Sequence, residues 1–244
     1  MKHMIGLLIL SSTLNGVCTG EGTNLPSVEE ILTRYVDAIG GKAAIEKIST
    51  RVMKGTFEVP AEGISGPAEI YAKAPDLFLS SIQYPDFGNV LEGNNGKTAW
   101  TKNPDSGLRE INGTELTTFK RDHDFYRELK LNTFFPRMTV KERVNLDSGQ
   151  AYLVEAAPAG GDIEKLFFDL KSGLLIRRDF ERVTIDEGIT PVKISYEDYR
   201  EVDGVKLPFT VTQATPDYVT QMKFTEIKQN IPIDTTKFDK PAAP

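Results

Sequence analysis

The sequence has few of the side chains that most often carry out catalysis. It contains two histidines, His3 and His123, and a single cysteine, Cys18. His3 and Cys18 both lie in residues 1–20, so a chain that lost this segment would keep one histidine and no cysteine. Such a chain has no disulfides, no Cys/His zinc site and no thiol nucleophile. We therefore expect no metal site and no cofactor.

Long apolar runs and an excess of positive charge are also missing. No stretch reaches the roughly 18 apolar residues of a spanning helix, so we expect no transmembrane span in the mature chain. The 35 acidic residues outnumber the 29 Lys and Arg, which gives a formal net charge of −6. This balance argues against nucleic acid or an anionic membrane as a bulk electrostatic partner. The hydrophobic share of 39% is ordinary for a globular chain that builds a core.

Residues 1–20 have the layout of a secretory signal peptide. A basic start at Lys2 is followed by the short apolar run 4–10 and by small residues near Cys18. We predict cleavage before Glu21 and a periplasmic or secreted protein. Cys18 leaves open acylation as an outer-membrane lipoprotein, although Val17 and Asn15 match the required lipobox poorly.

An amphipathic helix is predicted to begin after Ser27. Ser27 and Glu30 have the spacing of a capping box, and Gly40-Gly41 is a typical helix end. Apolar residues recur between them with helical periodicity, so one face of this helix must lie on an apolar surface. These residues are Val28, Ile31, Leu32, Tyr35, Val36 and Ile39. A short second helix is predicted over 42–48.

From residue 50 the hydrophobic period changes to two, which indicates strands. Residues 50–111 are predicted to form an antiparallel meander, with Asn95-Gly96 as a hairpin turn. Residues 114–135 interrupt it with one or two helices, which Pro136 ends. Strands then resume with turn residues between them. They are predicted at 139–146, 152–157, 164–169, 174–185, 192–202, 206–214 and 218–227.

The fold class is therefore mainly β (α+β), with a single domain. We predict about eleven strands in a large curved antiparallel sheet or incomplete β-barrel, covered by the N-terminal helix and the inserted helices. The domain is expected to span 21–239, with 240–244 as a C-terminal tail.

A curved sheet has a concave face that must be filled or occupied. If the helices cover this face without filling it, an apolar cavity remains, and such a cavity is a typical ligand site. Alternating strand positions supply the candidate lining residues, although each taken singly is expected to be ordinary core. They are Met53, Phe57, Ile70, Leu79, Leu91 and Trp100. The candidate lid residues are Leu116, Phe119 and Tyr126.

The order of helix and meander resembles the LolA/LolB superfamily, the lipoprotein carrier and receptor proteins of the bacterial envelope. More closely, it is similar to the "outer membrane lipoprotein-sorting protein" relatives of that fold. Four stretches carry the resemblance, and with the strand order they cover most of 27–238. They are 31–55 (ILTRYVDAIGGKAAIEKISTRVMKG), 93–100 (GNNGKTAW), 167–180 (FFDLKSGLLIRRDF) and 198–210 (DYREVDGVKLPFT).

The resemblance implies an incomplete antiparallel barrel, lidded by helices, that holds acyl chains or another apolar ligand. The carriers use an arginine to hold the lid, and Arg34 and Arg51 are the candidate positions here. Neither arginine carries a recognisable motif, so the resemblance leaves lipoprotein trafficking itself open.

Catalytic patterns are sparse. There is no GxSxG, no P-loop and no GxGxxG motif. The segment 121–124 (RDHD) places carboxylates beside His123, which suggests a base or a weak metal site; we favour a solvated helix face instead. Asp179 and Glu181 share a strand face as a candidate carboxylate pair, but neighbouring arginines favour an ion-paired, solvent-facing ladder. Tyr196, Tyr199 and Trp100 suggest a sugar-stacking surface, which core packing explains more simply.

Three functions remain in order of preference. The first is a non-enzymatic envelope protein, monomeric, that holds a lipid, an acyl chain or a lipoprotein anchor in the half-barrel. Envelope lipoproteins are then its expected partners. The second is a protein–protein interaction module of the envelope with a filled core. The third is a carboxylate-based hydrolase, for which the required site is missing.

Overall fold

The computed structural model describes residues 25–184 and 188–242. The predicted signal peptide, including Cys18, lies outside the described residues. No helix within the described ranges combines the length and the apolar character that a membrane crossing requires.

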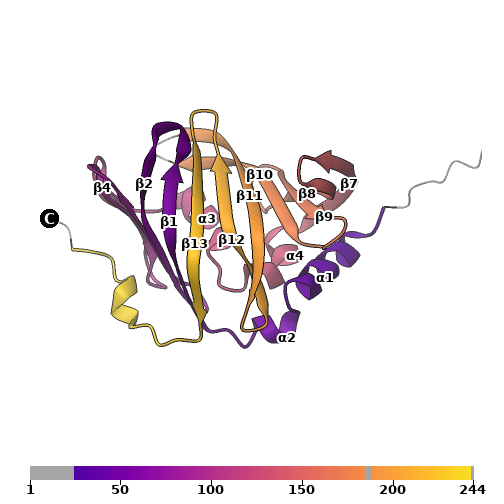
Figure 1. Ribbon diagram of the computed structural model, residues 1–244, viewed down its shortest axis with the longest axis horizontal. Helices are drawn as coiled ribbons and strands as arrows, with labels where there is room; N and C mark the ends of the chain where they lie inside the picture. Colours follow the sequence, from indigo (N-terminus) through magenta and orange to yellow (C-terminus); the bar gives the residue numbers. More distant parts are fainter. Residues whose placement is uncertain (1–24, 185–187, 243–244) are drawn as a thin grey trace, which may run out of the picture.

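One open antiparallel sheet of thirteen strands dominates the structure (Figure 1). The predicted fold class, a large curved sheet covered by helices, is confirmed. The strands are β1 (Thr50–Val59), β2 (Ile64–Lys73), β3 (Leu77–Tyr84), β4 (Gly88–Asn94), β5 (Ala99–Asn103), β6 (Gly107–Glu110), β7 (Arg137–Leu146), β8 (Gly149–Ala157), β9 (Glu164–Asp169), β10 (Leu175–Thr184), β11 (Gly188–Val202), β12 (Val205–Ala214) and β13 (Val219–Gln229).

Two meanders make up the sheet, and its strand order is 6-5-4-3-2-1-13-12-11-10-9-8-7. We call β1–β6 the N-terminal arm and β7–β13 the C-terminal arm. Each strand pairs with its neighbour in the chain, and the two arms join where β1 pairs with β13, for example Arg51 opposite Gln229. The edge strands β6 and β7 are consecutive in sequence but lie at opposite ends of the sheet.

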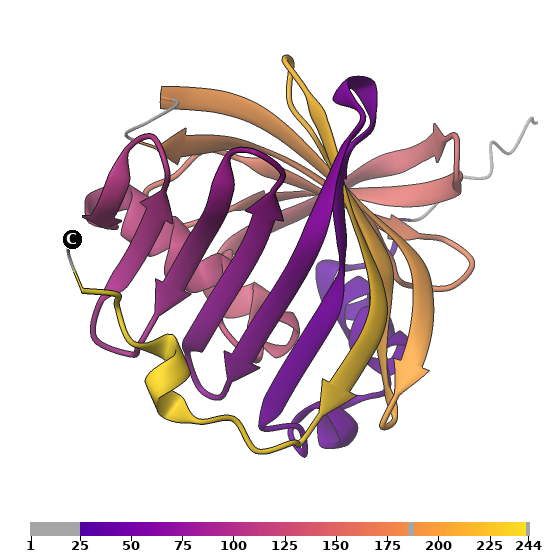
Figure 2. The same cartoon turned by 60° about the vertical axis from the view of Figure 1, so that its left-hand side comes forward.

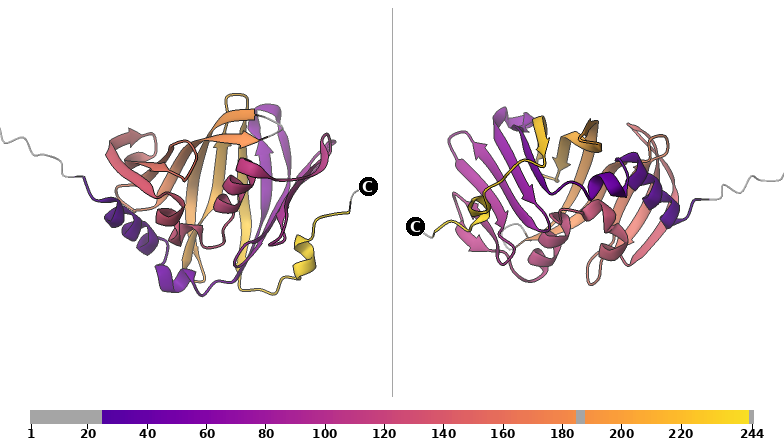
Figure 3. Two further views of the ribbon diagram at one scale, coloured as in Figure 1. Left: turned by 180° about the vertical axis from the view of Figure 1, so that it is seen from behind. Right: turned by 90° about the horizontal axis from the view of Figure 1, so that it is seen from below.

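Helices cover the concave face, as the views from behind and below show (Figure 3). Two precede the sheet: α1 (Val28–Ala38) and α2 (Lys42–Ile45). The remainder form the crossing segment, which connects β6 to β7 and consists of α3 (Gly113–Asp122), η2 (Arg127–Leu129) and α4 (Leu131–Phe134). Short 3-10 turns also occur at η1 (Pro60–Glu62) and η3 (Thr235–Phe238).

The start and end of α1 follow from the sequence as predicted. The Ser27 hydroxyl accepts a hydrogen bond from the Glu30 amide at 3.2 Å, and the Ser27 amide donates to the Glu30 carboxylate at 2.6 Å. Gly40 follows the helix with a φ of 123°, and a Cβ there would lie 2.1 Å from the Gly204 carbonyl oxygen. Only glycine permits this approach of the helix end to the β11–β12 turn.

The main core fills the space between these helices and the concave face. Its buried side chains include Ile31, Tyr35 and Ile39 of α1, and Phe168 of β9. The ring of Tyr35 meets that of Phe168 edge-on, with centroids 5.4 Å apart. The apolar stripe of α1 therefore does what its periodicity predicts and packs on the sheet.

A second cluster lies on the outer face of the N-terminal arm. Here the chain leaves β13 and passes over the outside of the sheet, so that η3 and the helices of the crossing segment lie on opposite sides of the strands (Figure 2). Phe238 of η3 is fully buried against Leu79 and Trp100. Trp100 lies so close to β4 that a Cβ at Gly93 would be 2.4 Å from its ring. The chain beyond β13 is thus part of the packed domain at least to Phe238.

The structure has more strands than the roughly eleven that the sequence predicts. The meander predicted over 50–111 accounts for β1–β6, with β4 and β5 on either side of the Asn95-Gly96 turn. Only the total number of strands is underestimated. The second predicted helix is also shorter than expected, since only Lys42–Ile45 is helical.

Removing the Phe238 ring tests the role of the C-terminal segment. We expect Phe238→Ala to lower the free energy of unfolding by about 3–5 kcal/mol, because the side chain is completely buried. The control Phe87→Ala removes a ring that is 39% exposed and should cost less than about 1.5 kcal/mol. Equal losses in urea denaturation would contradict the outer-face core.

Candidate functional site

Two pockets flank α1 on the concave side. The first, which we call the helix pocket, has a volume of about 230 Å³. It lies where α1 meets strands of the C-terminal arm, and apolar side chains of Ile31, Tyr152 and Phe168 line it. Its remaining lining residues are Pro26, Glu30, Arg34, Asp169 and Gly173. The pocket is apolar within and polar at its rim.

The second pocket, which we call the arginine pocket, has a volume of about 70 Å³. Arg51 of β1 and Arg127 of η2 line it together with Glu128. Its other lining residues are Tyr35, Ile39, Ile45, Leu175, Tyr196, Tyr199, Val205, Lys206, Leu207 and Pro208. Four charged residues, three of them basic, thus line this pocket.

Buried tyrosines contribute to the arginine pocket. Burial raises the pKa of Tyr35, Tyr196 and Tyr199, so their phenols remain neutral. The Tyr199 hydroxyl donates to the Leu175 carbonyl at 2.7 Å. Tyr196 and Tyr199 lie three residues apart on β11 and both line the pocket, and Asp198 between them has a φ of 53°.

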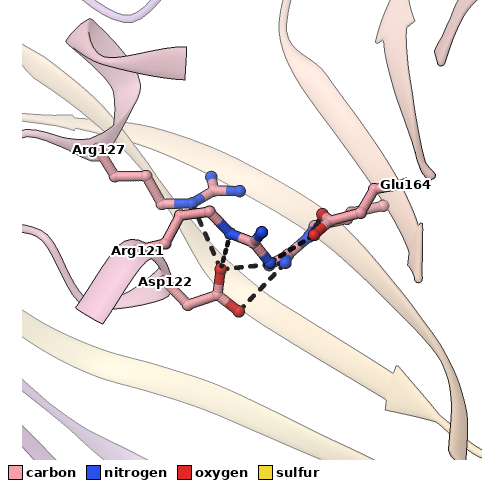
Figure 4. Close-up of polar contacts among 5 residues, drawn as sticks. Arg121, Asp122, Arg127 and Glu164 are labelled. Atoms are coloured by element: carbon pink, nitrogen blue, oxygen red, sulfur yellow. Dashed lines mark hydrogen bonds and ion pairs between the residues drawn. The ribbon is translucent and has the colours of Figure 1, made fainter. Parts of the chain in front are cut away.

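A buried ion cluster lies next to the arginine pocket (Figure 4). Glu164 of β9 accepts hydrogen bonds from Arg121 of α3 at 2.5 Å and from Arg178 of β10 at 2.6 Å. Asp122 accepts from Arg178 at 3.0 Å, and its carboxylate lies 4.0 Å from the Nε of Arg127. The cluster thus links the crossing segment to the C-terminal arm.

The cluster controls the charge of its members. Burial alone would raise the pKa of Asp122, but the surrounding arginines lower it to about 2. Burial would lower the pKa of Arg178, whereas Asp122 and Glu164 raise it. Asp122 and Arg178 are therefore both charged at neutral pH, and neither is poised for proton transfer.

The next residue, His123, faces the other arm of the sheet. Its ring stacks on Phe78 of β3 with centroids 3.9 Å apart and also contacts Phe119 at 4.4 Å. Burial lowers the pKa of His123 from 6.5 to about 4, against the attraction of the Asp122 charge. The end of α3 is therefore attached to both arms, by charge on one side and by aromatic stacking on the other.

These contacts correct our interpretation of residues 121–124. We favoured a solvated helix face, and this is wrong, because Arg121 is buried and Asp122 and His123 are engaged with the sheet. Neighbouring residues on a helix point in different directions, as expected. Here Asp122 points to Arg178 of the C-terminal arm and His123 to Phe78 of the N-terminal arm. No three metal-ligating side chains gather anywhere in 25–184 or 188–242.

The prediction of an ion-paired, solvent-facing ladder at Asp179 and Glu181 holds in part. Asp179 forms a bidentate ion pair with Arg177, as a ladder would, and Glu181 is exposed. Arg178 does not belong to this ladder, since it is buried in the ion cluster. Asp179 is therefore ion-paired and Glu181 faces solvent, and the two do not form a buried carboxylate pair.

The six candidate lining residues do not lie on one face. Met53 and Ile70 pack against the main core, and Phe57 against a cluster with Ala68 on the same side. Leu79, Leu91 and Trp100 belong instead to the outer cluster around Phe238. Alternation identified apolar positions but not their face, because both faces of the N-terminal arm are covered. Neither pocket is lined by any of the six.

The three lid candidates all lie in the crossing segment over the concave face. Phe119 is buried with Phe78, and Leu116 packs beside them. Tyr126 packs on the main core, and its hydroxyl donates to the Ile48 carbonyl at 2.9 Å. Trp100 lies on the other face from Tyr196, so the three aromatic residues considered for sugar stacking are not brought together.

Comparison with known proteins tests the resemblance that the sequence suggests. The sequence matches no protein-family model and no curated protein. The structure aligns with a DUF1329 family protein from Desulfovibrio piger (TM-score 0.60, 12% identity, 87% of this chain and 97% of that chain). It also aligns with a LolA superfamily protein from Nitrosomonas europaea (0.56, 12%, 88% and 99%). The chain has a LolA-like fold.

A third structure with this LolA-like fold comes from Vibrio parahaemolyticus and is described as an outer membrane lipoprotein-sorting protein domain. It aligns with a TM-score of 0.51 and 9% identity over 87% of this chain and 94% of that chain. The fold predicted from the four sequence stretches is therefore confirmed.

Of the two candidate arginines, Arg34 lies on helix α1 and Arg51 on strand β1. Arg34 projects from α1 and donates to the carbonyls of Leu170 and Lys171 at 2.6 and 3.0 Å, so it attaches α1 to the β9–β10 turn. Arg51 lies in the arginine pocket, with its guanidinium 5.4 Å from the Phe125 ring centroid. Arg34 is the one whose contacts join a helix to the sheet.

Sequence reasoning missed the ion cluster. Its partners are separated by many residues, and charged side chains are normally expected at the surface. One signal was available. Arg178 and Phe180 are two residues apart on a strand and so share a face, and in a strand with one solvent-facing side a charged and an apolar residue would lie on opposite faces. The two do contact, with the guanidinium 4.0 Å from the ring centroid.

Neutralising Glu164 tests the ion cluster. Glu164→Gln leaves Arg121 and Arg178 without their shared charge, and we expect it to lower the free energy of unfolding by about 3–5 kcal/mol. The control Glu155→Gln neutralises a carboxylate that pairs with Lys141 and whose side chain is 30% exposed, compared with 5% for Glu164. It should cost at most about 1 kcal/mol. A loss at Glu164 no larger than at Glu155 would contradict a structural role for the cluster.

The pH dependence of stability tests the stacked histidine. The pKa of His123 is lower in the folded state, so below pH 6.5 the unfolded state binds a proton that the folded state does not. Stability should therefore fall between pH 6.5 and about 4, by up to roughly 3 kcal/mol from this group. His123→Phe should flatten the profile of unfolding free energy in this window. A variant profile that runs parallel to the wild type would refute the assignment.

Proposed function

We propose that the chain is a periplasmic or secreted binding protein that holds an apolar ligand, such as an acyl chain, between α1 and the concave face of the sheet. The observation that carries this proposal is the helix pocket, which lies between the apolar stripe of α1 and the strands beneath it. The name of the Vibrio parahaemolyticus neighbour, which refers to lipoprotein sorting, supports the same class of ligand.

The ligand would enter by displacing α1. At about 230 Å³ the helix pocket is smaller than the 300–1,000 Å³ or so of most ligand sites. The rest of the concave face is occupied by the main core, to which α1 contributes Ile31, Tyr35 and Ile39. Moving α1 would join the pocket to an apolar surface, and a ligand that binds this open state would shift the population toward it.

Arg34 is suited to control this movement. Its two hydrogen bonds hold α1 to the β9–β10 turn, and they are exposed to solvent. Exposed hydrogen bonds are replaced by water at little net cost, so the attachment is reversible. The Arg34 stem also packs over Gly173, where a Cβ would lie 2.9 Å from its Cγ.

The proposed role is binding without catalysis. His123 is stacked on Phe78 and has a low pKa, and Asp122 is held ionised by arginines. These groups are engaged in structure and do not point at a substrate site.

A second candidate is an interaction module of the envelope, which the filled concave face favours. Val183 and Ile189, which are cross-strand partners near the tip of the β10–β11 hairpin, are 38% and 68% exposed. Exposed apolar pairs of this kind are suited to contact with another protein. In this case the helix pocket would be a packing defect.

Retained lipid distinguishes the two. The full chain, expressed with its own first residues in a bacterial envelope and purified without detergent, should show in native mass spectrometry a discrete extra mass that extraction identifies as lipid. Arg34→Ala should speed hydrogen exchange in α1 and raise the retained fraction, because the helix loses its attachment and the open state that binds the ligand becomes more populated. The control Arg200→Ala, which removes an exposed pair with Asp198, should change neither. A clean mass with no gain after incubation with lipids or an acylated peptide would refute the binding proposal.

A further inference from the structure

The arginine pocket contains buried hydrogen-bond donors without acceptors. The Nε of Arg51 and both Nε and Nη2 of Arg127 have no hydrogen-bond partner among residues 25–184 and 188–242. Arg127 is only 7% exposed. Arg51 donates one hydrogen bond, from its Nη2 to the Gln229 side chain at 3.3 Å. Buried guanidinium donors are normally satisfied, because leaving them unpaired is costly.

The surrounding charges do not balance these arginines. Glu128 lines the same pocket and is the nearest compensating charge for Arg51. Asp122 lies 4.0 Å from Arg127 Nε but already accepts hydrogen bonds from Arg178. Across the pocket and the ion cluster, four arginines (51, 121, 127 and 178) face three carboxylates (122, 128 and 164). The exposed Lys206 at the pocket adds further positive charge.

The pocket has the size and donors for one small charged group. Its volume of about 70 Å³ is enough for a small charged group such as a carboxylate or a phosphate. The neutral phenols of Tyr35 and Tyr196 line the same space and can donate hydrogen bonds. Guanidinium groups bind carboxylate and phosphate oxygens in pairs with good geometry.

We propose that the arginine pocket binds an oxyanion, a carboxylate or a phosphate ester, between the guanidinium groups of Arg51 and Arg127. The bound oxygens accept from the three unpaired N–H donors and supply the negative charge that the buried cluster lacks. Water would satisfy the donors but would leave the charge uncompensated.

The position of the pocket relates the oxyanion to the apolar ligand. α1 lies between the two pockets, with Ile31 lining the helix pocket and Tyr35 lining the arginine pocket. A ligand with its chain under α1 would place an anionic headgroup in the arginine pocket. The assignment of the oxyanion to a headgroup rests on the proposed function, whereas the oxyanion site itself does not.

Three probes separate the sources of the oxyanion: inorganic phosphate, octyl phosphate and octan-1-ol. Calorimetric titration of the full chain should show octyl phosphate binding at least tenfold more tightly than octanol. Arg127→Met and Arg51→Met should each weaken octyl phosphate binding at least tenfold and leave octanol binding unchanged. Arg127→Lys, which keeps the charge but loses the paired donors, serves where the Met variant does not fold and should also weaken it. The control Arg137→Met removes an exposed arginine that lines neither pocket and should have no effect.

Each outcome decides the question. The oxyanion site would be overturned if octyl phosphate bound no more tightly than octanol. It would also be overturned if the Arg51 and Arg127 variants bound octyl phosphate and inorganic phosphate with unchanged affinity. Inorganic phosphate binding as tightly as octyl phosphate, with loss in the variants, would support the site and assign it to a free anion. Phosphate binding without any octanol binding would support the site and count against the proposed apolar ligand.

Discussion

Glu164 accepts hydrogen bonds from α3 and from β10 in a region with little access to water, and Asp122 adds a second bridge between the same elements. Removing charges from water is expensive, so such a cluster persists only because each carboxylate has several partners. The crossing segment depends on it, since this segment must pass over the whole concave face between the edge strands. His123 and Phe119 complete the attachment on the side of the N-terminal arm. The helices over the concave face therefore differ in their polar attachments, which are buried for the crossing segment and exposed for α1.

This difference in attachment supports the binding function that we propose. A ligand site that must open requires an element whose displacement costs little beyond the apolar surface it covers. The crossing segment carries ionic and aromatic contacts to both arms, whereas α1 has an apolar stripe and the single arginine attachment at Arg34. Both pockets lie against α1 and neither depends on the crossing segment alone. In the proposed function, the concave face of the LolA-like sheet is the support and α1 is the element that a ligand would displace.

Local signals in the sequence predict the fold well. The capping box at Ser27, the stripe of α1 and the turn glycines each have a short-range cause, and all are found in the structure. The candidate site was much less predictable. Trp100 and Leu79 alternate in the same way as Met53, but the C-terminal segment covers the outer face and gives both faces a core. Arg127 and Arg178 belong to no sequence motif. Both lie near Asp122 only because of how the crossing segment passes over the sheet. The arginines and carboxylates of the arginine pocket and the ion cluster come from five separate elements (β1, α3, η2, β9 and β10), so no local sequence pattern contains them.

The strand order also has a consequence for how the chain folds. Every strand pairing joins strands that are consecutive in the chain except the pairing of β1 with β13, where Arg51 lies opposite Gln229. Local pairings form quickly, whereas a pairing between distant segments must first overcome the entropy of closing a long loop. Each arm can therefore form its own ladders early, as a separate meander with one exposed central edge. The two central edges then have to find each other, and until they do each is an open template for another copy of the chain. The join at the centre of the sheet is thus the step at which correct folding and aggregation compete.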